Sequence, residues 1–149
     1  MRTLNTFPPN WEQIQKVFPR AKEQEAVFCY GEVLHNPFGA KITRDLEVHE
    51  ATHSNQQGKD PKGWWDKYCE DPKFRYEQEL QAYGLQLYFL KTNKVKKLDE
   101  GKEIEMYIPT RVIDWYLDKI AQTLSGELYG NVTTYHKART AIRHFIKEI

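Results

Sequence analysis

The stretch TRDLEVHEATHSNQQG, residues 43–58, decides which fold the chain is expected to adopt. Thr43 is a residue type that caps helix N-termini, acidic residues follow in the first turn, and Gly58 is a typical C-terminal stop. Together these signals predict a helix from about Arg44 to Gln57. At its centre stand two histidines, and their spacing governs what the helix is expected to do.

His49 and His53 are four residues apart, so their imidazoles lie one above the other on one helical face. Zinc needs Zn–N distances of about 2.0–2.1 Å, and this spacing supplies two such ligands without bending the backbone. Glu50 flanks the metal and is placed to accept the proton of a zinc-bound water as a general base. The HExxH pattern therefore predicts a zinc site for hydrolysis; the plain alternative is two ordinary side chains of an amphipathic helix.

A third ligand is expected in RYEQELQAYGLQ, residues 75–86, because catalytic zinc sites keep three protein ligands and leave a fourth position open. Glu77 and Glu79 are the candidates, and they cannot both serve because a two-residue step turns about 200° around a helix. Glu79 shares its face with Ala82, whose small side chain permits a close helix approach, whereas Glu77 shares its face with Leu80. Helix geometry leaves the choice open.

The remaining elements are predicted from caps, stops and apolar spacing. They are a capped helix over residues 10–18, a strand over 26–34, a loop with at most one helical turn over 58–72, a long helix over 72–91, a polar surface connection over 91–105, a helix over 110–126, a turn over 128–131 and a last helix from about 134. This order predicts one α+β domain over residues 1–149 that is mostly helical.

The composition excludes several classes of partner. Hydrophobic residues make up 40%, and 22 basic against 21 acidic residues leave no net field for nucleic acid or an anionic membrane. No apolar signal segment and no run of about 18 apolar residues occurs, so we expect a cytoplasmic protein without a membrane partner. Cys29 and Cys69 are expected to be reduced thiols, with a disulfide or metal ligation as the alternatives. The lysines between residues 91 and 97 are expected to be solvated surface.

HEATH followed by EQELQAY, residues 77–83, resembles the gluzincin type of zincin metallopeptidase. The runs at residues 35–58, 74–86 and 124–131 more closely resemble small zincin-like proteins of bacteriophage genomes, and the resemblance covers about residues 26–145. In that pattern the ligand heads a Glu-x-x-Ala-Tyr unit, which selects Glu79. The resemblance implies a small zincin-like α+β domain, mostly helical, with a short β-hairpin or small sheet over the active-site helix. In it an edge strand, here Val27 to Leu34, lies above the cleft and precedes that helix.

A zincin also needs a donor that stabilises the oxyanion formed when water attacks a carbonyl, commonly a Tyr or His. Tyr129, Tyr83, His136 and His35 are available, although buried hydroxyls more often satisfy polar groups of the core. Tyr129 is the first candidate because it stands in a turn of a segment that the resemblance includes. The edge strand can pair with an extended peptide, unless it is shielded; Trp64 and Trp65 are expected to form a hydrophobic lid rather than a cleft wall.

The sequence thus predicts a hydrolase with one Zn²⁺ ion held by His49, His53 and Glu79, with Glu50 as the base and a peptide or protein as substrate. By resemblance it would be encoded by a phage or prophage and work in the cytoplasm of a bacterial host. The alternative is a catalytically silent zinc-binding protein of the same fold that acts as a protein-binding or structural module. A purely structural zinc ranks third, because closed structural sites use four protein ligands.

Overall fold

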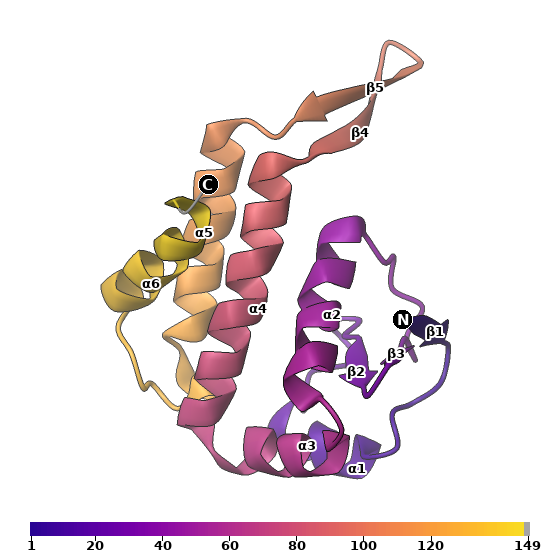
Figure 1. Cartoon of the computed structure of the whole chain (residues 1–149), viewed down its shortest axis with the longest axis vertical. Coiled ribbons are helices and arrows are strands. Elements are labelled where there is room, and N and C mark those ends of the chain that lie inside the picture. Colours follow the sequence, from indigo (N-terminus) through magenta and orange to yellow (C-terminus); the bar gives the residue numbers. More distant parts are fainter. Residues whose placement is uncertain (148–149) are drawn as a thin grey trace.

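Six α-helices and two small sheets make up the part of the chain that the computed structural model describes, residues 1–147 (Figure 1). The helices are α1 (Trp11–Val17), α2 (Arg44–Gln57), α3 (Pro61–Glu70), α4 (Pro72–Thr92), α5 (Thr110–Leu124), the short 3₁₀ helix η1 (Glu127–Tyr129) and α6 (Tyr135–Lys147). The strands are β1 (Arg2–Leu4), β2 (Phe28–Tyr30), β3 (Val33–His35), β4 (Lys94–Asp99) and β5 (Lys102–Tyr107). The fold is α+β and mostly helical, as predicted, and α2 has the predicted bounds.

Helix α4 is the central element, and its start follows from Asp71 and Pro72. Asp71 accepts hydrogen bonds from the backbone N–H groups of Lys73 and Phe74, and Pro72 takes the first helical position, where no N–H is needed. The 21-residue helix packs against α2 on one side and against α5 and α6 on the other (Figure 1). One helix therefore links the two halves of the molecule.

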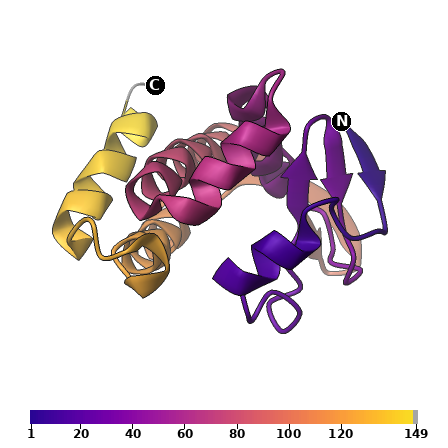
Figure 2. The same ribbon diagram turned by 90° about the horizontal axis from the view of Figure 1, so that it is seen from below.

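Buried apolar side chains form two separate clusters. One includes Leu87 of α4, Leu117 of α5 and Ile142 of α6; the other includes Phe28 of β2 and Trp65 of α3. In the view from below, α6 and the three-stranded sheet lie at opposite ends of the molecule (Figure 2). Helix α2 differs from both clusters because all of its buried residues are polar: His49, Glu50, Thr52, His53 and Gln57.

The predicted strand over residues 26–34 is instead a tight hairpin. Its two-residue turn is at Gly31-Glu32, where Gly31 has φ 61°, a left-handed conformation that favours glycine. Strand β2 pairs antiparallel with β3, and β3 pairs parallel with β1, which gives the order β1-β3-β2. Strand β2 is therefore an edge strand, and α2 packs against it.

Two predicted connections are regular structure, so those predictions were wrong. Residues 61–70 form α3, where Asp60 accepts from the backbone N–H of Gly63 and Pro61 begins the helix. Residues 94–107 form the hairpin β4–β5, with left-handed φ values at Glu100 and Gly101 in its turn. The hairpin extends beyond the helices (Figure 1), and most of its residues are exposed on both faces, so alternation of apolar residues is weak.

The expected side-chain caps at Asn10 and Thr43 do not form. Neither side chain bonds a helix N–H; the Asn10 amide donates to the side chain of Gln13 instead. The predicted turn at 128–131 contains the end of η1 and Gly130, whose φ is 68°.

Within residues 1–147, no helix has both the length and the apolar character that crossing a bilayer requires.

The close contact between α4 and α6 at Gly84 yields a stability prediction. A Cβ atom at Gly84 would overlap the ring of Phe145. We expect Gly84→Ala to lower the free energy of unfolding by about 1–2 kcal/mol, because overpacking costs more than the gain in helix propensity. Urea denaturation measures this. Adding Phe145→Leu should make the double change cost less than the sum of the two single changes; strict additivity would contradict the contact.

Candidate metal centre

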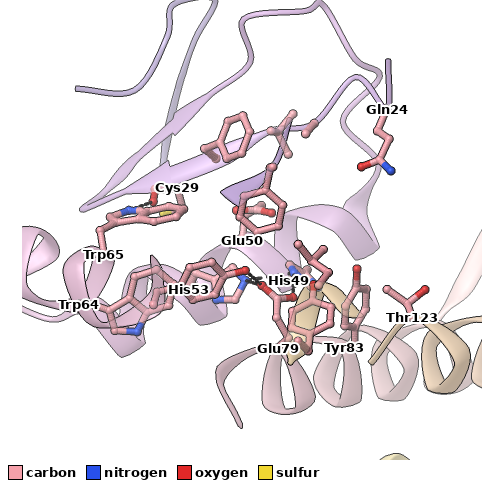
Figure 3. Close-up of a pocket in the computed structure, with 17 residues that line it drawn as sticks. Gln24, Cys29, His49, Glu50, His53, Trp64, Trp65, Glu79, Tyr83 and Thr123 are labelled. Carbon is pink, nitrogen blue, oxygen red and sulfur yellow. Dashed lines mark hydrogen bonds and ion pairs between the residues drawn. The ribbon is translucent and has the colours of Figure 1, made fainter. Parts of the chain in front are cut away.

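Helix α2 presents both histidines to one point beneath strand β2, as the HExxH spacing predicted. Figure 3 shows the imidazoles of His49 and His53 and the carboxylate of Glu79 pointing toward one another. The two Nε2 atoms lie 3.1 Å apart. Glu79 Oε2 lies 3.2 Å from Nε2 of His49, and Glu79 Oε1 lies 3.1 Å from Nε2 of His53. All three side chains are buried, so water does not screen these contacts.

The structure chooses between the two candidate glutamates. Glu79 is on the face of α4 that packs against α2, whereas Glu77 is exposed to solvent. Ala82, one turn further along α4, is completely buried, in keeping with the expected close approach of the two helices. His49, His53 and Glu79 together form a group whose possible ligand atoms all lie within 4.8 Å of one another.

The spacing of the two Nε2 atoms and the Glu79 carboxylate is close to the spacing of ligands around a small metal ion. A metal with bonds of about 2.0–2.1 Å to its ligands holds neighbouring ligand atoms about 3.3 Å apart. The two Nε2 atoms lie 3.1 Å apart, and each of them lies 3.1–3.2 Å from a different oxygen of the Glu79 carboxylate. The residues present are thus close enough to bind a metal ion with little movement.

The other ring nitrogen of each histidine meets a glutamine oxygen. His49 Nδ1 lies 3.0 Å from Oε1 of Gln86, and His53 Nδ1 lies 2.8 Å from Oε1 of Gln56. A carbonyl oxygen accepts hydrogen bonds, so each Nδ1 is the donor. In a neutral ring so bonded, the lone pair is then on Nε2, which faces the other histidine and Glu79.

The charges in this group are strongly coupled. Burial disfavours both charged forms, yet the attraction between the partners outweighs it: the pKa of His53 rises to about 9, and the pKa of Glu79 falls well below its usual range. Burial also raises the pKa of Glu50, while the nearby histidines oppose that rise. A positive charge between the two rings and Glu79 is therefore favoured, and the three side chains could hold a metal ion there.

Tyr68 is a site residue that the sequence reasoning missed. Its hydroxyl donates a 2.6 Å hydrogen bond to Glu79 Oε1, and its ring stacks on Trp64 with centroids 4.8 Å apart. The prediction had assigned this segment to a loop. The signal was present in the sequence, because Asp60-Pro61 is a helix start that sets Trp64, Trp65 and Tyr68 on adjoining faces of one helix.

The comparisons with known proteins add no relative. No protein-family model, curated protein or solved structure matches this chain. The geometry of the chain itself is therefore what supports the site.

A cavity of about 220 Å³ opens beside the three possible ligands. Glu50 lines it, at a place between the histidines and β2, but contributes no atom to the ligand group (Figure 3). Aromatic side chains supply much of the wall: Phe18, Phe28, Trp64, Trp65, Tyr68, Tyr83 and Tyr129. The cavity combines a polar floor with apolar walls, which is typical of small-molecule and peptide sites.

The four oxyanion-donor candidates divide into two pairs. Tyr129 and Tyr83 line the cavity, and burial raises the pKa of both hydroxyls, so both remain proton donors at neutral pH. His35 instead faces Thr6, with its Nδ1 3.1 Å from the threonine hydroxyl, and His136 lines a shallow pocket on α6. Of these four candidates, the structure brings only the two tyrosines to the cavity beside the metal group.

Trp64 and Trp65 are buried in the wall of the cavity, so the expectation of a separate lid was wrong.

Strand β2 is an edge strand, but its edge is partly occupied. The carbonyl oxygen of Cys29 accepts hydrogen bonds from Gln57 Nε2 at 2.8 Å and from Trp65 Nε1 at 3.1 Å. An extended peptide cannot pair there without displacing these two hydrogen bonds.

Both cysteines are free thiols, and burial raises the pKa of Cys29 to about 12, so this residue carries no charge near the site.

The hydrogen bond from Tyr68 to Glu79 yields a second prediction. Tyr68→Phe keeps the ring and removes only the hydroxyl, so metal-free protein should lose about 1.5–3 kcal/mol of unfolding free energy, the usual worth of a hydrogen bond to a charged group. Thermal or urea unfolding measures the change. Tyr135→Phe is the matched control, since its hydroxyl donates to the partly exposed carboxylate of Asp118 at 2.7 Å and should cost under about 1 kcal/mol. Equal losses of unfolding free energy in Tyr68→Phe and Tyr135→Phe would contradict the claim that burial makes the Tyr68–Glu79 hydrogen bond the stronger one.

Proposed function

We propose that the protein is a zinc-dependent hydrolase whose substrate is a peptide or protein. One observation carries the proposal: two imidazole Nε2 atoms and one carboxylate, all buried, stand 3.1–3.2 Å apart at the floor of a cavity. Two nitrogens and one oxygen are a donor set that zinc uses when it serves catalysis. The resemblance of the HExxH and Glu-x-x-Ala-Tyr segments to gluzincins supports the same assignment.

In this proposal His49, His53 and Glu79 hold one zinc ion, and no fourth protein ligand is needed. Zinc so held supplies a Lewis acid that polarises a carbonyl and lowers the pKa of water. Tyr68 holds the Glu79 carboxylate in place through its 2.6 Å hydrogen bond. The aromatic walls lower the polarity around these residues, which strengthens the electrostatic contacts on the cavity floor.

Glu50 is the proposed general base. It follows His49 on α2, lines the cavity and contributes no atom to the ligand group, so its carboxylate is left to accept a proton from the attacking water. Tyr129 and Tyr83 are the proposed donors to the oxyanion, because both line the cavity. Tyr129 remains the first of the two, as the sequence expectation had it.

A second function is favoured by the occupied edge of β2. An extended peptide substrate would be expected to pair with the edge strand, but Gln57 and Trp65 already bond the Cys29 carbonyl there. A catalytically silent protein that keeps the metal and binds a partner would need no such pairing. The two functions share the metal and differ in whether any peptide bond is broken.

The ligand assignment predicts a difference between two glutamates on one helix. Purified wild-type protein should carry about one zinc per chain, and Glu79→Gln should lose most of it, because an amide oxygen carries no charge and binds zinc poorly. Glu77→Gln is the matched control and should keep full zinc, since Glu77 is exposed. Elemental analysis after dialysis measures the content. Full zinc in both variants would overturn the assignment of Glu79.

The proposed base predicts a separation between metal content and turnover. Glu50→Gln should keep its zinc, because Glu50 is not in the ligand group, and should lower cleavage of a peptide library by at least about a hundredfold. Mass spectrometry of the library measures cleavage. Equal cleavage by both proteins would exclude Glu50 as base. No cleavage by either, with zinc present in both, would favour the silent binding protein.

A further inference from the structure

Two glutamine side chains contact the ring nitrogens of the ligand histidines that face away from the metal position. Gln86 of α4 faces His49, and Gln56 of α2 faces His53. An amide group can present either its oxygen or its NH₂ to a neighbour, so the direction of each contact depends on what holds the other end of the amide.

Gln86 is held at its other end by a carboxylate. Its Nε2 donates to Oδ2 of Asp45, in the first turn of α2, at 2.7 Å. A carboxylate at neutral pH only accepts hydrogen bonds, so the NH₂ group must point to Asp45 and the oxygen must point to His49 Nδ1. Asp45, Gln86 and His49 therefore form a chain with a single direction, in which Nδ1 carries the hydrogen.

Gln56 is held by a main-chain carbonyl of the opposite helix. Its Nε2 donates to the backbone oxygen of Gln78 at 3.0 Å and to Oε1 of Gln81 at 2.8 Å. A backbone oxygen also only accepts, so the oxygen of Gln56 must point to His53 Nδ1, which lies 2.8 Å away. Two independent chains thus impose the same arrangement on the two rings.

We propose that Gln86 and Gln56 are positioning residues that hold the ring hydrogens of His49 and His53 on Nδ1 and so keep both Nε2 atoms free for one metal ion. The inference rests on the metal-binding part of the proposed function. Each contact also sets the rotation of its ring, since the hydrogen bond lies in the ring plane. The anchors are Asp45 and the Gln78 carbonyl, neither of which touches the metal position.

The test compares zinc affinity, by competition with a chelator, among variants of the Asp45–Gln86 chain. Gln86→Leu removes the acceptor and should weaken zinc binding by about 10–100-fold, the usual cost of losing such a partner. Asp45→Asn lets the Gln86 amide turn around and should weaken binding by a smaller factor. The double variant Asp45→Asn/Gln86→Glu restores an acceptor at His49 with a donor behind it, and should bind zinc at least as tightly as the wild type.

Gln57→Leu is the matched control. Gln57 is a buried glutamine of α2 that bonds only the backbone of Cys29 and Gly31. This variant should lose stability and keep zinc affinity, which separates positioning from folding. A tenfold loss of affinity in Gln57→Leu would mean that any buried glutamine matters, and would overturn the inference. So would unchanged affinity in both Gln86→Leu and Asp45→Asn, or a double variant as weak as Gln86→Leu.

A second readout does not depend on turnover. NMR at saturating zinc should show a slowly exchanging Nδ1–H proton for each ligand histidine, and Gln86→Leu should lose the His49 signal alone. Loss of neither signal would overturn the inference. If the wild-type protein binds no zinc, the proposed function fails. The Nδ1–H signals of the metal-free protein then still test the two glutamine contacts, so failure of the proposed function and failure of this inference can be told apart.

Discussion

Three hydrogen-bond acceptors brought within 3.1–3.2 Å of one another, and buried, are the constraint on which the rest of the structure depends. Two imidazole lone pairs and a carboxylate repel one another unless a cation lies between them, and burial removes the water that would soften that repulsion. Several features of the fold act on this one point. Tyr68 bonds Glu79, Gln86 and Gln56 bond the histidines, and aromatic rings close the surroundings.

The helix that carries the histidines is stabilised in an unusual way. All buried residues of α2 are polar, so its packing against α4 does not come from an apolar stripe. Each buried polar group instead needs a specific partner, and the two apolar clusters on either side hold those partners in place. Such a helix contributes little apolar burial to the core. It is well suited to a functional site, because its buried side chains are held by hydrogen bonds rather than by apolar packing.

Sequence patterns predicted the helices well where they carried local signals. Helix α2 follows from its acidic first turn and Gly58, and α4 follows from Asp71-Pro72. The same reasoning missed α3 and the hairpin β4–β5. Helix α3 was missed because its short segment between two prolines was interpreted as a loop, although Asp60-Pro61 marks a helix start and the aromatic residues have helical spacing. The hairpin is exposed on both faces, so it lacks the apolar alternation on which strand prediction depends. One predicted strand is two, because the turn at Gly31 interrupts an otherwise uniform apolar run.

By itself, the sequence determined the pair of possible metal ligands, because a spacing of four residues on a helix places His49 and His53 on one face whatever the rest of the chain does. It also placed Glu50 beside them. Helix geometry left Glu79 and Glu77 both open, and only the resemblance favoured Glu79. The tertiary structure decided between them, because the face of α4 that carries Glu79 packs against α2. Tyr68 and Gln86 were likewise decided by packing, because a hydrogen bond between separate segments leaves no periodic trace in the sequence. Gln56 is different: it lies three residues after His53 on α2, a spacing that is visible in the sequence, and packing decided only its anchors on α4.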